Sequence, residues 1–210
     1  MSTPPDDAQP VAQGGGEQTI MNIHGERVGL GPLRRDLIPL YLRWANDFGY
    51  TRTTAAPGLT LSLEQLTRAY AGVVADGSNI SFVIYDRATG RPIGTTALDH
   101  IDHRHRTAEF SIGIGDEAFR GKGYGTEATL LVLDYAFTVL GLTNVMLVVY
   151  EFNQVGRRAY EKAGFGEFGR RHHAHRMGGR PWDVIYMECV AGDFTSPVLG
   201  RVVVPDQPLT

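Results

Sequence analysis

The sequence contains a single cysteine, Cys189, among its 210 residues. One thiol cannot form an internal disulfide, which favours a reducing, cytoplasmic location. The chain also lacks any apolar run near the ~20 residues that a membrane-spanning helix needs. It has no basic excess either, because 20 Lys and Arg stand against 23 Asp and Glu, for a net charge of -3. That balance argues against a nucleic-acid-binding protein.

The length and the hydrophobic content of 42% predict one ordinary domain, which we place at residues 19–192. Residues 1–18 are polar and rich in Pro, Gly and Asp, and they lack the apolar core of a signal peptide. We expect them to be a disordered leader. Residues 193–210 form a C-terminal tail whose Val202, Val203 and Val204 suggest packing on this domain or on a partner subunit.

Hydrophobic periodicity divides the central region into strands and helices. Strands are predicted at residues 27–33, 80–85, 92–101, 108–114, 144–150, 165–173 and 182–190, helices at 36–45, 62–77, 125–140 and 153–163, and a loop at 46–60. Three consecutive strands form a meander, and the helix after them leads to a strand that can pair in parallel. The fold class is therefore mixed α/β: a central, mostly antiparallel sheet with one parallel strand pair, flanked by helices.

A glycine-rich segment, Arg-Gly-Lys-Gly-Tyr-Gly-Thr at residues 120–126, joins a predicted strand to a long apolar helix. Glycines let the backbone approach a ligand closely, and the first N–H groups of a helix have no partner within it. Together with the helix dipole, they make an anion site. A ligand that carries a pyrophosphate is the natural expectation.

Two other phosphate-binding loops fit this segment less well. A Walker loop needs a Gly, four intervening residues, then Gly-Lys and a hydroxyl residue. Here Gly115 stands too far upstream, and Gly123 replaces the residue that would hold magnesium. Residues 113–118 match a dinucleotide fingerprint formally, but no helix begins there and the upstream strands form a meander. A reductase that binds NAD(H) is therefore the less favoured reading.

The motif Arg120-x-x-Gly123-x-Gly125 resembles the signature of Gcn5-related N-acetyltransferases. Its context is similar too, with Ala-Glu-Phe-Ser-Ile-Gly upstream at 108–113 and Ala-Tyr-Glu-Lys-Ala-Gly-Phe downstream at 159–165. The similarity is greatest to the branch that contains ribosomal-protein alanine and spermidine acetyltransferases. The resemblance covers nearly all of the predicted domain.

The resemblance implies acetyl-CoA as co-substrate. The pyrophosphate would bind the N–H groups of Gly121, Lys122, Gly123, Tyr124, Gly125 and Thr126, with Arg120 setting the turn. The strands at 108–114 and 144–150 would splay apart, and the pantetheine arm would pair with the exposed strand edge. A backbone N–H near Ile112 to Ile114 would contact the thioester carbonyl. Asn153 would contact CoA, serve as an N-cap, or do both.

The resemblance also implies catalytic residues for the attack of an amine on the thioester. Tyr160 aligns with the tyrosine that gives a proton or a hydrogen bond to the departing thiolate. Glu109 is the best candidate for the base that takes the ammonium proton, directly or through water. The alternatives are a core tyrosine at position 160 and a structural ion pair at position 109.

Other reactive side chains are interpreted as structural. Six histidines lie near two predicted hairpins, but strand alternation puts His173 and His175 on one face and His172 on the other, so we expect no metal site. Cys189 reads as a buried small hydrophobe. Asp134, within the apolar helix, is expected to mark the exposed side of that helix.

The acceptor is an amine whose identity the sequence leaves open. In the family, the loop between the first two helices covers the acceptor site. Here that loop contains Phe48, Tyr50 and Arg52, with Asp47 as its only acid. A polyamine is therefore not favoured, although Asp99, Asp102 and Glu109 could contribute carboxylates to such a site. We expect a small-molecule primary amine ahead of a protein N-terminus. The alternative from another class is a non-catalytic acyl-CoA-binding module, and the resemblance also allows a homodimer.

Overall fold

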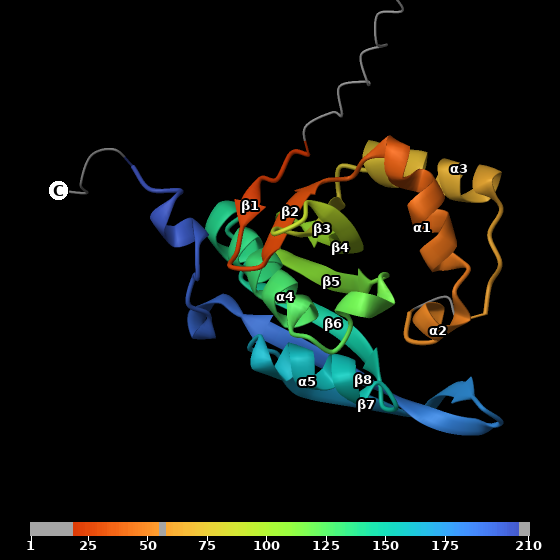
Figure 1. Cartoon of the computed structure of the whole chain (residues 1–210). Helices are drawn as coiled ribbons and strands as arrows, with labels where there is room; N and C mark the ends of the chain where they lie inside the picture. Colours follow the sequence, from red (N-terminus) through yellow and green to blue (C-terminus); the bar gives the residue numbers. More distant parts are fainter. Residues whose placement is uncertain (1–18, 55–57, 206–210) are drawn as a thin grey trace, which may run out of the picture.

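The computed structural model describes residues 19–54 and 58–205 (Figure 1). In this part of the chain, eight strands form one sheet in the order β1-β2-β3-β4-β5-β6-β8-β7. Among these strands, β5 and β6 form the one parallel pair. The predicted mixed α/β class is confirmed. The predicted leader, residues 1–18, lies outside the described residues.

The elements largely follow the predicted ranges. The strands are β1 (Ile23–His24), β2 (Val28–Pro32), β3 (Ile80–Asp86), β4 (Arg91–Asp102), β5 (Thr107–Ile114), β6 (Asn144–Tyr150), β7 (Gly166–Met177) and β8 (Arg180–Val190). The α-helices are α1 (Ile38–Ala45), α2 (Phe48–Thr51), α3 (Leu63–Ala75), α4 (Tyr124–Asp134) and α5 (Gln154–Lys162). Two elements were not predicted: β1, and α2 within the expected loop at 46–60. Residues 55–57 of that loop lie outside the described part.

The helices lie in two groups (Figure 1). Helix α4 packs along β2, β4 and β5 and also contacts α5. On β5, Ala108 and Phe110 are buried beneath these helices, whereas Glu109 and Ser111 are exposed. Helices α1, α2 and α3 gather at the other side of the molecule. No helix in the described ranges combines the length and the apolar character that crossing a membrane would require.

The prediction that Asp134 marks the exposed side of its helix is wrong, because the residue is fully buried. Its carboxylate accepts hydrogen bonds from the backbone N–H groups of Val198 and Leu199, at 2.9 and 2.8 Å, and from the Thr138 hydroxyl at 2.8 Å. Leu199 itself is buried in the core. The C-terminal segment therefore folds back and covers the helix face that periodicity assigns to solvent.

The helix predicted over 125–140 changes its winding at this point. Helix α4 ends at Asp134, and a π-helical turn, Tyr135–Val139, continues it. Such turns widen a helix locally, and they accompany functional or strained positions. Here the turn places the Thr138 hydroxyl on the buried Asp134 carboxylate.

Candidate active site

The turn that leads from β5 into α4 is organised by Arg120. Its guanidinium donates hydrogen bonds to the carbonyl oxygens of Ile114 and Gly115, at 2.9 and 2.7 Å. It also lies 3.4 Å from the Asp47 carboxylate and over the ring of Tyr50. The planar guanidinium suits these simultaneous contacts because its donors point in fixed directions. Arg120 thus ties the glycine-rich loop to the α2 region.

The glycines that follow adopt backbone conformations that other residues avoid. Gly121 and Gly123 have φ angles of +70° and +90°. A Cβ atom on Gly123 would also lie 2.8 Å from Nη2 of Arg27. Gly123 is the N-cap of α4, and no side chain in the described part of the chain caps this end. The first N–H groups of the helix are therefore left to a ligand, where the dipole favours an anion.

Strands β5 and β6 separate beside this helix end. They pair only from Thr107 opposite Asn144 to Glu109 opposite Met146. Beyond that point β6 stays paired with β8 along its whole length. The second half of β5, after Glu109, therefore has no partner strand along one edge. An extended ligand can add to such an edge as a strand would.

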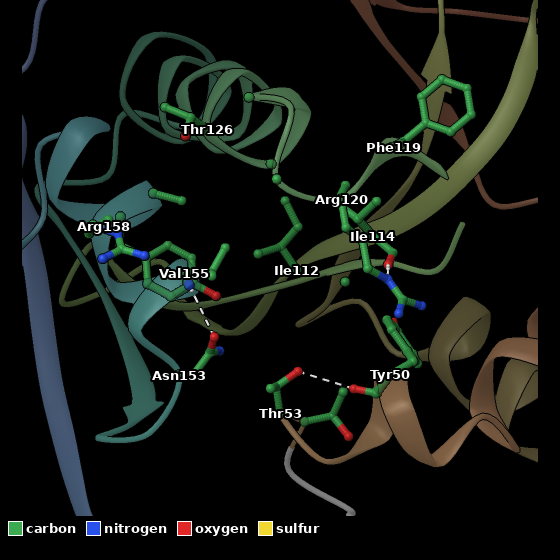
Figure 2. Close-up of a pocket in the computed structure, with 18 of the residues that line it drawn as sticks. Tyr50, Thr53, Ile112, Ile114, Phe119, Arg120, Thr126, Asn153, Val155 and Arg158 are labelled. Carbon is green, nitrogen blue, oxygen red and sulfur yellow. Dashed lines mark hydrogen bonds between the residues drawn. The ribbon is translucent and has the colours of Figure 1, made fainter. Parts of the chain in front are cut away.

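A pocket of about 630 Å³ lies where these features meet. Figure 2 shows Ile112 between Tyr50 and Thr53 on one side and Val155 and Arg158 on the other. The lining comes from the α2 region (Gly49, Tyr50, Arg52, Thr53, Thr54), from β5 and the loop into α4 (Ile112, Gly113, Ile114, Phe119, Arg120, Gly121, Gly123, Gly125, Thr126), and from α5 with its cap (Asn153, Val155, Gly156, Arg158, Ala159, Tyr160, Lys162).

Tyr160 faces this pocket from α5. Its ring packs edge-on against Phe110 and Phe165, with centroids 6.3 and 6.1 Å apart. Burial, with a smaller contribution from nearby Tyr50, raises the pKa of the Tyr160 phenol to about 12. The hydroxyl therefore keeps its proton at neutral pH and can donate it.

Asn153 also lines the pocket, and its side chain caps α5. Its Oδ1 accepts a hydrogen bond from the backbone N–H of Gly156 at 3.0 Å. Asn153 therefore acts as the N-cap of α5, which is one of the two roles that the sequence left open. The amide nitrogen of the side chain stays free of this bond, so both roles are compatible.

Three predicted site residues do not line the pocket. The Glu109 carboxylate is half-exposed on β5 and lies 3.6 Å from Nδ1 of His100. Lys122 is part of the glycine-rich loop but is not among the residues that line the pocket. The phenol of Tyr124 points elsewhere, since it donates a hydrogen bond of 3.0 Å to Asp86. For Lys122 and Tyr124, the backbone N–H groups remain as candidate ligand contacts.

Sequence reasoning missed the cationic face of α5. Val155, Arg158, Ala159 and Lys162 recur at the three- and four-residue spacing of one helix face, and all line the pocket. That spacing is visible in the sequence once the helix is placed. Thr53 and Thr54, in the turn that follows α2, carried no comparable signal, because the four-residue helix before them is too short to show periodicity.

The histidine hairpin differs in detail from its predicted geometry. A register shift between Arg171 and His175, with a φ angle of +54° at His173, interrupts the alternation on which the face assignment relied. His172 pairs with Asp183 at 2.9 Å, and His175 stacks on Tyr150. Within residues 19–54 and 58–205, no three His, Cys, Asp or Glu side chains gather as metal ligands do. Cys189 is buried, which raises the pKa of its thiol to about 11.

Comparison with known proteins gives consistent matches. Residues 27–166 match the family described as the acetyltransferase (GNAT) domain. A spermidine N(1)-acetyltransferase of Escherichia coli K12 is 36% identical over 123 residues, which are 59% of this chain and 64% of that protein. The mouse alpha/beta-tubulin-N-acetyltransferase 9 is 28% identical over 67% of this chain and 62% of its own. The chain thus spans less than two thirds of the length of these relatives.

A solved structure extends the likeness to the fold. The spermidine N-acetyltransferase of Vibrio cholerae, in complex with CoA and spermine, superposes with a TM-score of 0.74. It is 28% identical and covers 80% of this chain and 98% of its own.

Proposed function

Because the chain belongs to the GNAT acetyltransferase family, we propose that it transfers an acetyl group from acetyl-CoA to a primary amine. The observation that carries this proposal is the meeting of three features in one pocket. These are the uncapped N-terminus of α4, the free edge of β5 and the Tyr160 hydroxyl. Each suits a different part of a thioester of CoA.

The pyrophosphate would bind the N–H groups of the glycine-rich loop from Gly121 to Thr126. The positive φ angles of Gly121 and Gly123 allow the close approach that this needs. The pantetheine arm would lie along β5, with its amides paired to the free strand edge and the Asn153 side chain beside it. Arg158 and Lys162 would face phosphate groups of CoA, which supplies the activated acetyl group.

The thioester would then lie near Ile112 and Ile114, where a backbone N–H can stabilise the negative charge that develops on the carbonyl oxygen. The amine nitrogen attacks the carbonyl carbon, and the carbon–sulfur bond breaks. Tyr160 gives its proton to the leaving thiolate and regains one from solvent. The proton lost by the ammonium goes to Glu109 through water, since this carboxylate is exposed at the last paired position of β5 and β6.

We infer that the acceptor is a small molecule. Tyr50 and its neighbours on α2 lie across the end of β5 so closely that a Cβ on Gly113 would overlap the Tyr50 hydroxyl. A pocket narrowed at this end by Tyr50 suits a compact amine better than the N-terminus of a folded protein. The names of the relatives, which include polyamine and tubulin acetyltransferases, do not agree on one acceptor.

Isothermal titration with acetyl-CoA, followed by an assay of thiol release over a panel of amines and N-terminal peptides, tests the function. We expect binding, and release with at least one small amine. Binding without release for any acceptor would indicate a non-catalytic acyl-CoA-binding module instead. Absence of binding would refute the whole proposal.

Glu109→Gln tests the proposed base. We expect kcat to fall by about tenfold to 100-fold with the affinity for acetyl-CoA unchanged, because only proton removal is lost. Steady-state kinetics together with titration of acetyl-CoA measure both quantities. Glu64→Gln, at an exposed position on α3, is the matched control. A kcat equal to that of the unmodified protein would show that Glu109 serves only its ion pair with His100.

A further inference from the structure

The charge of the pocket is one-sided. Four cationic side chains line it, Arg52, Arg120, Arg158 and Lys162, and no aspartate or glutamate does so among the residues that the structure describes. The carboxylate of Asp47 is nearby, but it pairs with Arg120 and accepts the N–H of Gly49. The described lining of the pocket therefore favours anionic groups over cationic ones.

Three of these cations have uses already described. Arg120 holds the carbonyl oxygens of the β5–α4 turn. Arg158 and Lys162 lie one helical turn apart on α5, on the side proposed for the phosphates of CoA. Arg52 is different, because it comes from the C-terminal end of α2, with Tyr50, Thr53 and Thr54. This wall faces the glycine-rich loop across the pocket, as the positions of Tyr50 and Thr126 in Figure 2 show.

The two threonines beside Arg52 do not supply donors of their own. The Thr53 hydroxyl donates to the carbonyl oxygen of Tyr50 at 3.1 Å, and the Thr54 hydroxyl donates to that of Thr51 at 2.9 Å. Both hydroxyl protons are thus used within the α2 region, and the oxygens can only accept further bonds. Arg52 is exposed and forms no ion pair within residues 19–54 and 58–205. Among the described residues of this wall, Arg52 is the one with a positive charge, and its guanidinium has several N–H donors.

We propose that the acceptor carries an anionic group, a carboxylate or a phosphate, in addition to its primary amine, and that Arg52 binds this group. A guanidinium matches either anion with two parallel hydrogen bonds. A polyamine would instead bring a second ammonium toward Arg52, with no carboxylate in the described lining to compensate it. Like charges placed together disfavour the wrong ligand. Arg52 is then the residue that sets acceptor specificity.

The inference rests on the proposed acetyl transfer, and matched amines separate the two. Butylamine, γ-aminobutyrate and putrescine share a four-carbon chain and differ at its far end, which is neutral, anionic or cationic. O-Phosphoethanolamine and ethanolamine repeat the comparison with a phosphate. We expect kcat/KM to be at least about tenfold higher for an anionic acceptor than for its neutral analogue, and lowest for putrescine.

Arg52→Gln should abolish this preference by lowering kcat/KM for the anionic amines alone, and Arg52→Glu should reverse it toward putrescine. Both variants should bind acetyl-CoA as the unmodified protein does, since Arg52 is placed on the acceptor side. Arg68→Gln, at an exposed position of α3, controls for the loss of a surface charge. An equal loss for every amine, a weakened affinity for acetyl-CoA, or a preference for putrescine in the unmodified protein would overturn the inference while leaving acetyl transfer intact. Acetyl-CoA binding without thiol release from any amine would instead refute acetyl transfer, and the inference with it.

Discussion

Tyr160→Phe should lower kcat by about 100-fold or more, the usual loss when a general acid is removed. The ring still packs on Phe110 and Phe165, so the pocket keeps its shape. Only the proton for the thiolate is missing, and the affinity for acetyl-CoA should stay within about twofold of the original. Thiol-release kinetics and titration of acetyl-CoA together measure the two effects.

The dependence of kcat on pH tests the role of Tyr160 independently. Burial raises the pKa of Tyr160 to about 12, so the phenol is protonated below that pH and loses its proton only above it. We therefore expect kcat to rise with pH as the amine loses its proton, with no descending limb up to about pH 10. Tyr186→Phe, on β8 against Phe168, is the matched control. A kcat of Tyr160→Phe equal to that of this control would assign Tyr160 to packing alone.

Asp134→Ala should lower the free energy of unfolding by about 3 kcal/mol or more, because hydrogen bonds to a buried charged group contribute about 1.5–3 kcal/mol each. The substitution leaves the N–H groups of Val198 and Leu199 and the Thr138 hydroxyl without their acceptor. Urea unfolding measures the change, and proteolysis after residue 193 should accelerate with it.

A chain that ends at Asp193 is the decisive comparison. It lacks both the two N–H donors and the segment that covers Asp134, so water can solvate the carboxylate, and Asp134→Ala should then cost much less than in the full chain. Asp193→Ala in the full chain is the control for the loss of a carboxylate near this segment. Equal losses in the full and shortened chains would show that the C-terminal segment is not held by Asp134.

The predictions from sequence succeeded where a signal is local. The glycine-rich loop lies between a strand and a helix as expected, and the meander and the crossover to β6 follow from alternation and chain order. Tyr160 and Asn153 line the same pocket as Arg120 and Ile112. These residues come from segments whose own patterns fix where they stand.

The predictions were wrong or incomplete where contacts with distant segments of the chain determine whether a residue is buried or lines the pocket. Asp134 has the spacing of an exposed residue on an apolar helix, and only the return of residues 194–205 buries it. Helix α2 is only four residues long, so the strongest signal for it in the sequence was Asp47, a residue type that commonly caps helices. Arg158 and Lys162 of α5 become candidate site residues only because that helix lines the same pocket as the glycine-rich loop, an arrangement that no local sequence pattern encodes.

The order of strands has a consequence for how the chain folds during its synthesis. Strand β6 is held to β5 over three residue pairs but to β8 over its full length, and β8 is the last strand within residues 58–205. During synthesis, β6 and α5 leave the ribosome well before the strand that fixes them. The wall of the pocket that α5 provides is therefore completed last, and we expect a nascent chain that has not yet made β8 to carry the glycine-rich loop without a finished site.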